Sequence, residues 1–181
     1  NLQGQLISET TEAGQAIKDY LWHGMSPVAQ IEAGVTERIY YLHTDHLMTP
    51  RFATDASSEV VWRWEGQAFG EADAQNDVDG NGELVEINLR FPGQYFDAET
   101  QMHYNYFRNY DPGTGRYGQS DPLGLAAGDN TYGYAYQSPF VYIDRDGRLP
   151  IIVPIGFCVV GGVGPALGGD VSGAVLGCGI S

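Results

Sequence analysis

Apolar and aromatic residues recur in short alternating runs along most of this chain, and turn residues separate the runs. Residues 16–22 and 28–33 are rich in apolar side chains and flank a turn over residues 24–27. Trp62 and Trp64 lie two positions apart, so both indoles are expected on the core-facing side of one strand. Helical periodicity is hard to find. The pattern predicts a mainly β fold of short antiparallel strands and hairpins.

Tyrosines alternate with other residues in two later segments. Over residues 104–109, Tyr and Arg alternate with Asn and Phe, which predicts a strand that ends at the turn beginning with Asp111. Residues 132–136 hold three alternating tyrosines and predict another strand. A turn over residues 137–139 would then send residues 140–143 back along it as a hairpin.

Two five-residue blocks lie at the ends of this second predicted hairpin. DPLGL occupies residues 121–125 and DRDGR occupies residues 144–148, with eighteen residues between them. The hairpin would bring Asp121 and Asp144 together. Asp residues of this kind commonly cap turns through their own backbone. Two close carboxylates can also share a proton, one acting as base on water and the other as acid. The two residues alone do not decide between these interpretations.

An acidic loop over residues 77–88 resembles a calcium-binding loop of the EF-hand type. Gly82 stands where that loop bends sharply, but Asn88 occupies the position of the usual bidentate Glu. A plain loop with Asp-Gly and Asn-Gly turns explains the same letters. Calcium is thus a candidate ligand, and no cofactor is required. The candidate calcium ligands are Asp77, Asp79, Asn81 and Glu83.

A second metal hypothesis concerns His43, Asp45 and His46. On a strand, His43 and Asp45 would share one face while His46 would point the other way. A structural role for these residues is therefore the favoured interpretation.

Charge limits the range of partners. The formal net charge is −14 at pH 7, and Lys18 is the single lysine beside eight arginines. Such a field repels phosphate, which argues against nucleic-acid binding by this chain. At 181 residues, the chain has room for one domain and a tail.

Residues 150–181 form an apolar, Gly-rich tail that follows a core over residues 1–149. Asp170 is the tail's one charged side chain. Glycines recur there every four residues, a spacing that allows close helix packing in lipid, whereas two prolines argue against one continuous span. Membrane contact is expected only through this tail, which otherwise reads as the flexible start of a variable C-terminal region. Cys158 and Cys178 could pair, but the sequence leaves their redox state open.

Five ordered motifs over residues 1–149 resemble the RHS (rearrangement hotspot) repeat-associated core. The resemblance implies a hollow β-shell built from YD-type repeats, whose C-terminal end the core closes. It also implies that the core cuts the chain and releases an enclosed C-terminal toxin. The motifs are YLHTDHLMTPR at 41–51, FPGQYFD at 91–97, YNYFRNYDP at 104–112, TGRY at 114–117 and DPLGL at 121–125.

By this resemblance, Asp121 and Asp144 match the family's aspartyl protease pair, and cleavage would follow Arg148. Two departures bear on that activity, because Arg145 replaces a Pro and Arg148 replaces a Leu of the family pattern. A site that buries Leu rejects a charged side chain unless a carboxylate pairs with it. Slow or absent self-cleavage is therefore expected, and no activity on an external substrate.

The implied partners are the rest of the chain's own RHS shell and a C-terminal toxin, with self-association as a further option. The resemblance implies a secreted or cell-surface location, as part of a larger exported protein. The alternative is an uncleaved surface adhesion or filament-forming structural protein that is built on the same core.

Overall fold

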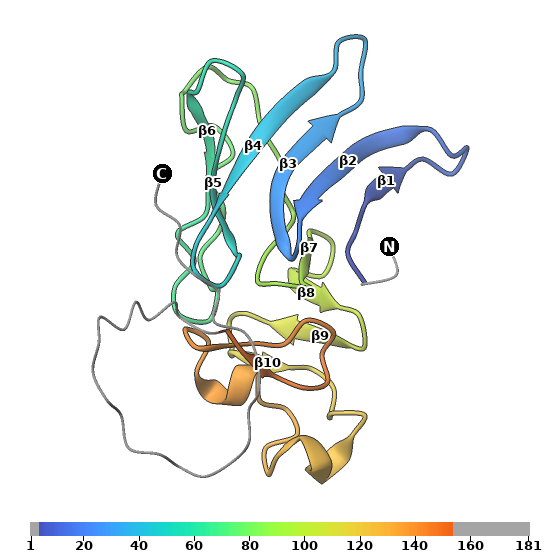
Figure 1. Cartoon of the computed structure of the whole chain (residues 1–181), viewed down its shortest axis with the longest axis vertical. Coiled ribbons are helices and arrows are strands. Elements are labelled where there is room, and N and C mark those ends of the chain that lie inside the picture. Colours follow the sequence, from blue (N-terminus) through green and yellow to red (C-terminus); the bar gives the residue numbers. More distant parts are fainter. Residues whose placement is uncertain (1–3, 154–181) are drawn as a thin grey trace, which may run out of the picture.

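The first six strands form one antiparallel sheet, in which each strand pairs with the next along the chain. The computed structural model describes residues 4–153 (Figure 1). The turn predicted between residues 16–22 and 28–33 is confirmed, since the second and third strands pair across it. The strands are β1 (Ser8–Thr10), β2 (Ala16–His23), β3 (Ser26–Glu32), β4 (Arg38–Thr44), β5 (Pro50–Thr54) and β6 (Val60–Arg63).

A second antiparallel sheet of four strands lies below the first in Figure 1. The predicted single strand over residues 104–109 is wrong, because a tight turn interrupts it at Tyr106, whose φ is +56°. The turn breaks the alternation, so Asn105 and Arg108 are both buried while Tyr104 is half exposed. The strands are β7 (Tyr95–Asp97), β8 (Met102–Asn105), β9 (Arg108–Asp111) and β10 (Arg116–Tyr117), in the order β10-β9-β8-β7.

One hydrophobic core draws on both sheets and on the long connection between β6 and β7. Trp62 and Trp64 are fully buried, as their spacing predicts. The connection contributes apolar side chains at alternate positions, as a strand would. These residues of the connection are Val85, Ile87, Leu89 and Phe91.

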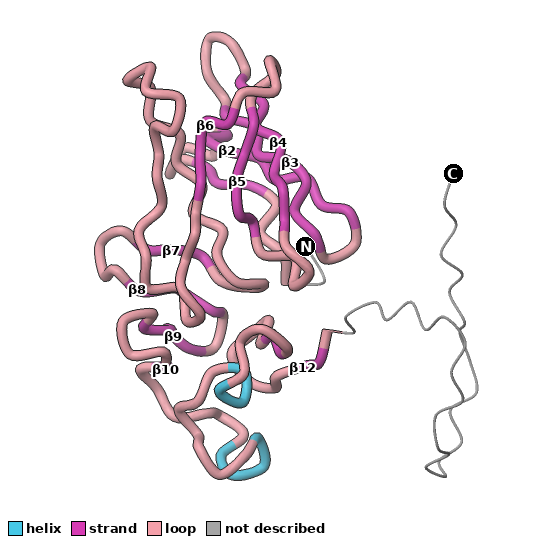
Figure 2. Tube along the Cα trace, turned by 90° about the vertical axis from the view of Figure 1, so that its left-hand side faces the viewer, coloured by secondary structure: helices cyan, strands magenta, loops and turns pink. Residues whose placement is uncertain are grey.

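The C-terminal part packs against β9 and β10 (Figures 1 and 2). The predicted hairpin of residues 132–136 with 140–143 is wrong. A 3-10 turn, η2 (Ala135–Gln137), replaces the first strand, and all three of its residues have positive φ. Tyr134 is consequently buried alone, without the tyrosines on either side of it.

A short strand pair forms in its place. β11 (Tyr142–Ile143) pairs with β12 (Ile151–Ile152), so strand pairing extends past residue 149. A second 3-10 turn, η1 (Gly124–Ala127), overlaps the end of the DPLGL block. The two Asp-containing blocks still come together, although a different backbone path joins them.

The predicted fold class, mainly β with short antiparallel strands, is confirmed. Within residues 4–153, no helix is long and apolar enough to cross a membrane. The predictions for the Gly-rich tail and its two cysteines concern residues that lie almost entirely outside the described part of the chain.

Candidate functional site

Arg108 lies between the two aspartates that the sequence singles out. Its Nη2 atom is 2.8 Å from Asp121 Oδ2 and 3.2 Å from Asp144 Oδ2. The side chains of all three residues are at most 3% exposed. The predicted meeting of Asp121 and Asp144 is therefore observed, and a buried guanidinium joins the two carboxylates.

Asp144 accepts four hydrogen bonds at this point. Its Oδ1 atom accepts from the backbone N–H groups of Gly147 and Arg148, each at 3.0 Å. Its Oδ2 atom accepts from the Tyr117 hydroxyl at 2.9 Å as well as from Arg108. Burial nevertheless raises the pKa of Asp144, against the opposing effect of these donors.

The remaining donors of Arg108 hold the same segment. Nε donates to the Gly147 carbonyl at 2.5 Å, and Nη1 donates to the Thr131 carbonyl at 2.9 Å. The guanidinium also lies over the Tyr117 ring, 3.6 Å from its centroid. Burial and the nearby Asp144 raise the pKa of Tyr117, so its hydroxyl remains a donor.

Asp121 is fixed by its own turn and by the neighbouring chain. Its Oδ1 atom accepts from the Leu123 N–H at 2.8 Å, and its own N–H donates to the Thr131 carbonyl at 2.8 Å. The turn-capping interpretation is therefore observed for both aspartates, and each carboxylate also forms an ion pair with Arg108.

The loop of the DRDGR block packs closely onto the end of β8. Gly147 has φ of +76°, and a Cβ added there would lie 2.7 Å from the Asn105 carbonyl oxygen. The Asn105 amide donates to the Asp144 carbonyl at 2.8 Å and to the Tyr117 hydroxyl at 2.7 Å. A residue with a side chain would not fit at position 147 without moving this backbone.

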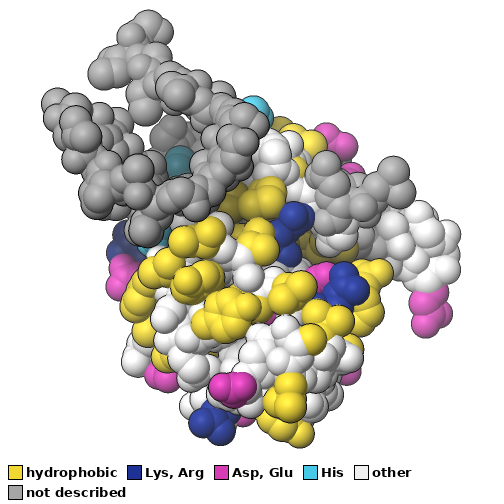
Figure 3. All heavy atoms as spheres, turned by 60° about the horizontal axis from the view of Figure 1, so that its bottom comes forward, with side chains coloured by type: hydrophobic (Ala, Val, Ile, Leu, Met, Phe, Trp, Pro, Cys, Tyr) yellow, Lys and Arg dark blue, Asp and Glu magenta, His cyan; other side chains and the backbone are white. Residues whose placement is uncertain are grey.

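The predicted cleavage bond, between Arg148 and Leu149, lies beside an open cavity of about 410 Å³. Leu149 is half exposed. Figure 3 shows hydrophobic side chains spread over this end of the molecule. The cavity is lined by Leu123, Arg145, Asp146, Arg148, Leu149 and Ile151.

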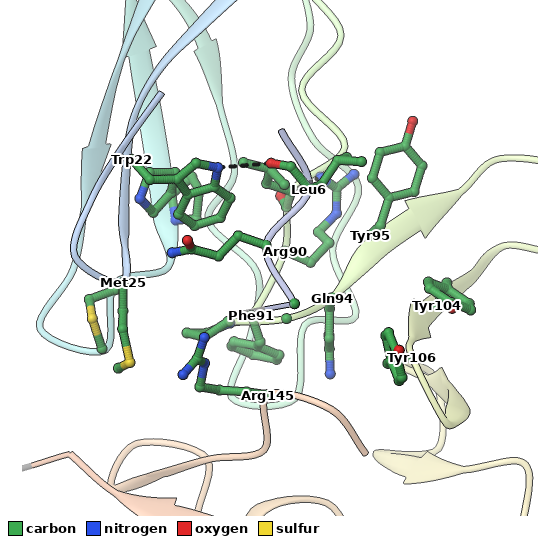
Figure 4. Close-up of a pocket in the computed structure, with 18 of the residues that line it drawn as sticks. Leu6, Trp22, Met25, Arg90, Phe91, Gln94, Tyr95, Tyr104, Tyr106 and Arg145 are labelled. Carbon is green, nitrogen blue, oxygen red and sulfur yellow. Dashed lines mark hydrogen bonds between the residues drawn. The ribbon is translucent and has the colours of Figure 1, made fainter. Parts of the chain in front are cut away.

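A larger, mostly apolar cavity of about 470 Å³ lies between the first sheet and β7–β8 (Figure 4). Trp22 and Met25 line it from one side and Tyr104 and Tyr106 from the other. Arg145 lines both cavities, and its carbonyl would lie 1.9 Å from a Cβ added at Gly93. The DRDGR block therefore lines both cavities, the one beside the predicted cleavage bond and the larger apolar one.

The acidic loop directs its polar groups mainly to one another. The Asn81 amide donates to Asp79 at 2.7 Å, and Asn81 Oδ1 accepts from the Glu83 N–H at 2.6 Å. Glu83 also pairs with Arg38 at 3.0 Å, and Asp77 Oδ1 accepts from the Gly82 N–H at 3.4 Å. Within residues 4–153, no three His, Cys, Asp or Glu residues form a group that could hold a metal ion. The calcium site stays a prediction.

The other metal hypothesis concerned His43, Asp45 and His46, and their contacts are structural. Asp45 pairs with Arg51 at 2.8 Å and accepts from two backbone N–H groups of its own turn. His43 stacks on Phe52, and the His46 Nε2 atom lies 3.0 Å from the Phe140 carbonyl oxygen.

The sequence reasoning missed Arg108, Tyr117 and Asn105 as members of the site. All three belong to β8, β9 and β10, within the motifs that carry the resemblance. The available signal was Arg108 within the tyrosine-rich segment 104–110. An arginine buried in such a segment requires carboxylates nearby, which points to the two aspartates.

Residues 39–76 match the family model described as RHS protein. The chain belongs to the RHS proteins. It is 34% identical to "Double-stranded DNA deaminase toxin A" of Burkholderia cenocepacia, over 79% of this chain and 11% of that protein. It is 38% identical to "Toxin protein Tse5" of Pseudomonas aeruginosa, over 66% of this chain and 9% of that protein. This RHS chain spans about a tenth of the length of these two relatives.

Solved structures share the fold of this RHS chain. A crystal structure described as TcdB2-TccC3 without hypervariable C-terminal region matches with a TM-score of 0.58 and 20% identity, over 74% of this chain and 7% of that one. A crystal structure of TcdB2-TccC3-Cdc42 matches with a TM-score of 0.56 and 22% identity, over 72% of this chain and 6% of that one.

Proposed function

We propose that this RHS core closes one end of the β-shell of a larger, exported toxin-type protein. The membership of the RHS proteins, the toxin names of the relatives and the shared fold support this role. The partners would be the rest of the same shell and a C-terminal toxin, with export of the whole protein to the cell surface or beyond.

We further propose that Asp121 and Asp144 cut the chain after Arg148. The observation that carries this proposal is the convergence of both carboxylates on Arg108 Nη2. A second contact supports the proposed position of the cut, because Asp144 also accepts from the N–H of Arg148. The carboxylate pair and the residue that precedes the bond proposed for cleavage therefore belong to one network of ion pairs and hydrogen bonds.

The proposed reaction is hydrolysis of one peptide bond. Asp121 accepts a proton from water as the oxygen attacks the Arg148 carbonyl carbon, and the bond to the Leu149 nitrogen breaks. Asp144 acts as the acid in its protonated form, which burial favours by raising its pKa, and gives that proton to the departing amine. In this form Asp144 gives up one of the four hydrogen bonds that its carboxylate accepts in the structure. Arg148 gains the new carboxylate. Cleavage is accordingly expected to slow as the pH rises through the pKa of Asp144.

A second candidate function is an uncleaved structural cap, as in an adhesion or filament protein. The turn-capping bonds from Leu123 to Asp121 and from Gly147 to Asp144 favour it. In that case the ion network would fasten the C-terminal segment to β8–β10 and carry out no chemistry.

Purified chain, together with its Asp121→Asn and Asp144→Asn variants, distinguishes the two functions. The proteins are incubated at mildly acidic and neutral pH, and cleavage is followed on denaturing gels. Self-cleavage predicts that the wild type splits while both variants stay whole. Melting of each variant by circular dichroism shows that the fold is retained. A wild type that stays whole at every pH contradicts self-cleavage and favours the structural cap.

A further inference from the structure

Two groups from different segments hold the side chain of Arg148. Its Nε and Nη2 atoms donate to Asp146 Oδ2 at 2.9 and 2.5 Å. Its guanidinium lies over the ring of Phe107, 4.3 Å from the centroid. The Phe107 N–H donates to the Asp146 carbonyl at 3.1 Å. The two groups that contact Arg148 are therefore also bonded to each other.

The location of these contacts matters because Arg148 immediately precedes the bond proposed for cleavage. An arginine in a closed apolar site would lose its hydration without compensation. Here Asp146 neutralises the charge, the Phe107 ring covers one face of the guanidinium, and the Arg148 side chain remains 43% exposed. The same ring would serve as an apolar contact for a Leu at position 148, the residue that the family resemblance implies.

We propose that Asp146 and Phe107 are specificity determinants that adapt the self-cleavage site to an arginine before the cut bond. The inference rests on the proposed self-cleavage. The substrate is the chain's own segment, in which Asp146 supplies the acceptor for the cationic head group. The expectation that Arg148 hinders cleavage required that no carboxylate be in reach, and Asp146 removes that condition.

The test measures the first-order rate of cleavage in four proteins: the wild type, Asp146→Asn, Arg148→Leu and the double variant. Because the pair is partly exposed, we expect Asp146→Asn to slow cleavage about fivefold in the wild-type background. In the Arg148→Leu background the same substitution should leave the rate within about twofold, since no cation remains to be neutralised.

Two further variants serve as controls. Glu65→Gln removes the carboxylate of another arginine pair, Arg63–Glu65 at 3.5 Å, and should leave the cleavage rate unchanged. Phe107→Leu tests the ring independently of Asp146, and its half-exposed position keeps the cost to folding small. It should slow cleavage in the wild-type background more than in the Arg148→Leu background.

The outcomes separate the specificity role from the cleavage itself. Equal slowing by Asp146→Asn in both backgrounds would mean that Asp146 acts only on the fold, and would overturn the inference. If Arg148→Leu is cut and the wild type is not, self-cleavage stands but the adaptation to arginine is refuted. If none of the proteins is cut, Arg148→Leu included, the proposed self-cleavage fails and this inference fails with it.

Discussion

Asp121 and Asp144 form ion pairs with the same atom, Nη2 of Arg108, at 2.8 and 3.2 Å. The two aspartates therefore share a cation, a partner that neither turn capping nor a shared proton had implied. A buried cation that serves two carboxylates ties the DPLGL block, the DRDGR block and β9 into one unit. Catalysis and stability are consequently expected to depend on the same residue.

Replacement of Arg108 should destabilise the fold strongly. The Arg108→Met variant leaves two buried carboxylates without their common partner, which is expected to cost about 3–5 kcal/mol of the free energy of unfolding. Chemical denaturation measures this change. Arg116→Met, at an exposed position of β10, is the matched control and should change stability by less than about 0.5 kcal/mol. Similar effects of the two substitutions would show that the buried network contributes little.

Gly147→Ala should destabilise the chain through a backbone clash. The new Cβ would lie 2.7 Å from the Asn105 carbonyl oxygen, at a residue with φ of +76°. Gly82→Ala is the matched control, because Gly82 has φ of +84° but no atom within 4 Å of the added Cβ. Both variants bear the cost of positive φ, about 1 kcal/mol, so the excess loss in Gly147→Ala measures the clash. Equal melting temperatures would contradict the close packing.

Acid should destabilise the fold through His103. Burial, followed by the charge of Arg90, lowers the pKa of His103 from 6.5 to about 3. The unfolded chain therefore binds a proton that the folded chain does not bind between these values, and stability falls as the pH falls below about 6.5. From pH 7 to pH 5 this loss amounts to about 2 kcal/mol.

The His103→Asn variant isolates that contribution, because its amide still reaches toward Gln94, the hydrogen-bond partner of His103 Nδ1 at 2.7 Å. The decrease in the free energy of unfolding between pH 7 and pH 5 should shrink by about 2 kcal/mol in this variant. His43→Asn removes an exposed imidazole and is the control. An unchanged pH dependence in His103→Asn would mean that another group causes the acid effect.

The calcium hypothesis makes a separate prediction. If the acidic loop binds Ca²⁺, added calcium raises the melting temperature by mass action, and a chelator reverses the effect. Asp79→Asn should abolish the shift, whereas Asp97→Asn, at the last residue of β7, should preserve it. An identical melting temperature with calcium and with chelator would remove Asp77, Asp79, Asn81 and Glu83 from consideration as ligands.

The sequence predicted the strands of the first sheet better than the C-terminal part, and the reason is local. In β2 and β4 buried and less buried positions alternate as the two faces of one sheet require, although Lys18 is buried and Leu21 is exposed. In residues 132–136 the alternating tyrosines mislead, because the positive φ of Ala135 and Tyr136 turns the chain before a second strand can form. Positive φ at residues other than glycine leaves little trace in a sequence.

The sequence predicted the two aspartates of the site but not the arginine between them. The predicted hairpin would bring Asp121 and Asp144 together; the hairpin is wrong, yet both carboxylates do meet at Arg108. The predicted alternation put Arg108 on the face opposite Asn105, whereas the turn at Tyr106 shifts the register so that both are buried. A partner that depends on such a shift becomes visible only when the backbone path is known.

The masses of the fragments released by the purified wild-type chain test the central claim most directly. Cleavage by the aspartate pair predicts one N-terminal fragment that ends in the free carboxylate of Arg148 and one C-terminal fragment that begins with Leu149, both absent from Asp121→Asn. An intact wild-type mass, or a break at any other bond, would contradict the assignment of Asp121 and Asp144 as a self-cleaving pair.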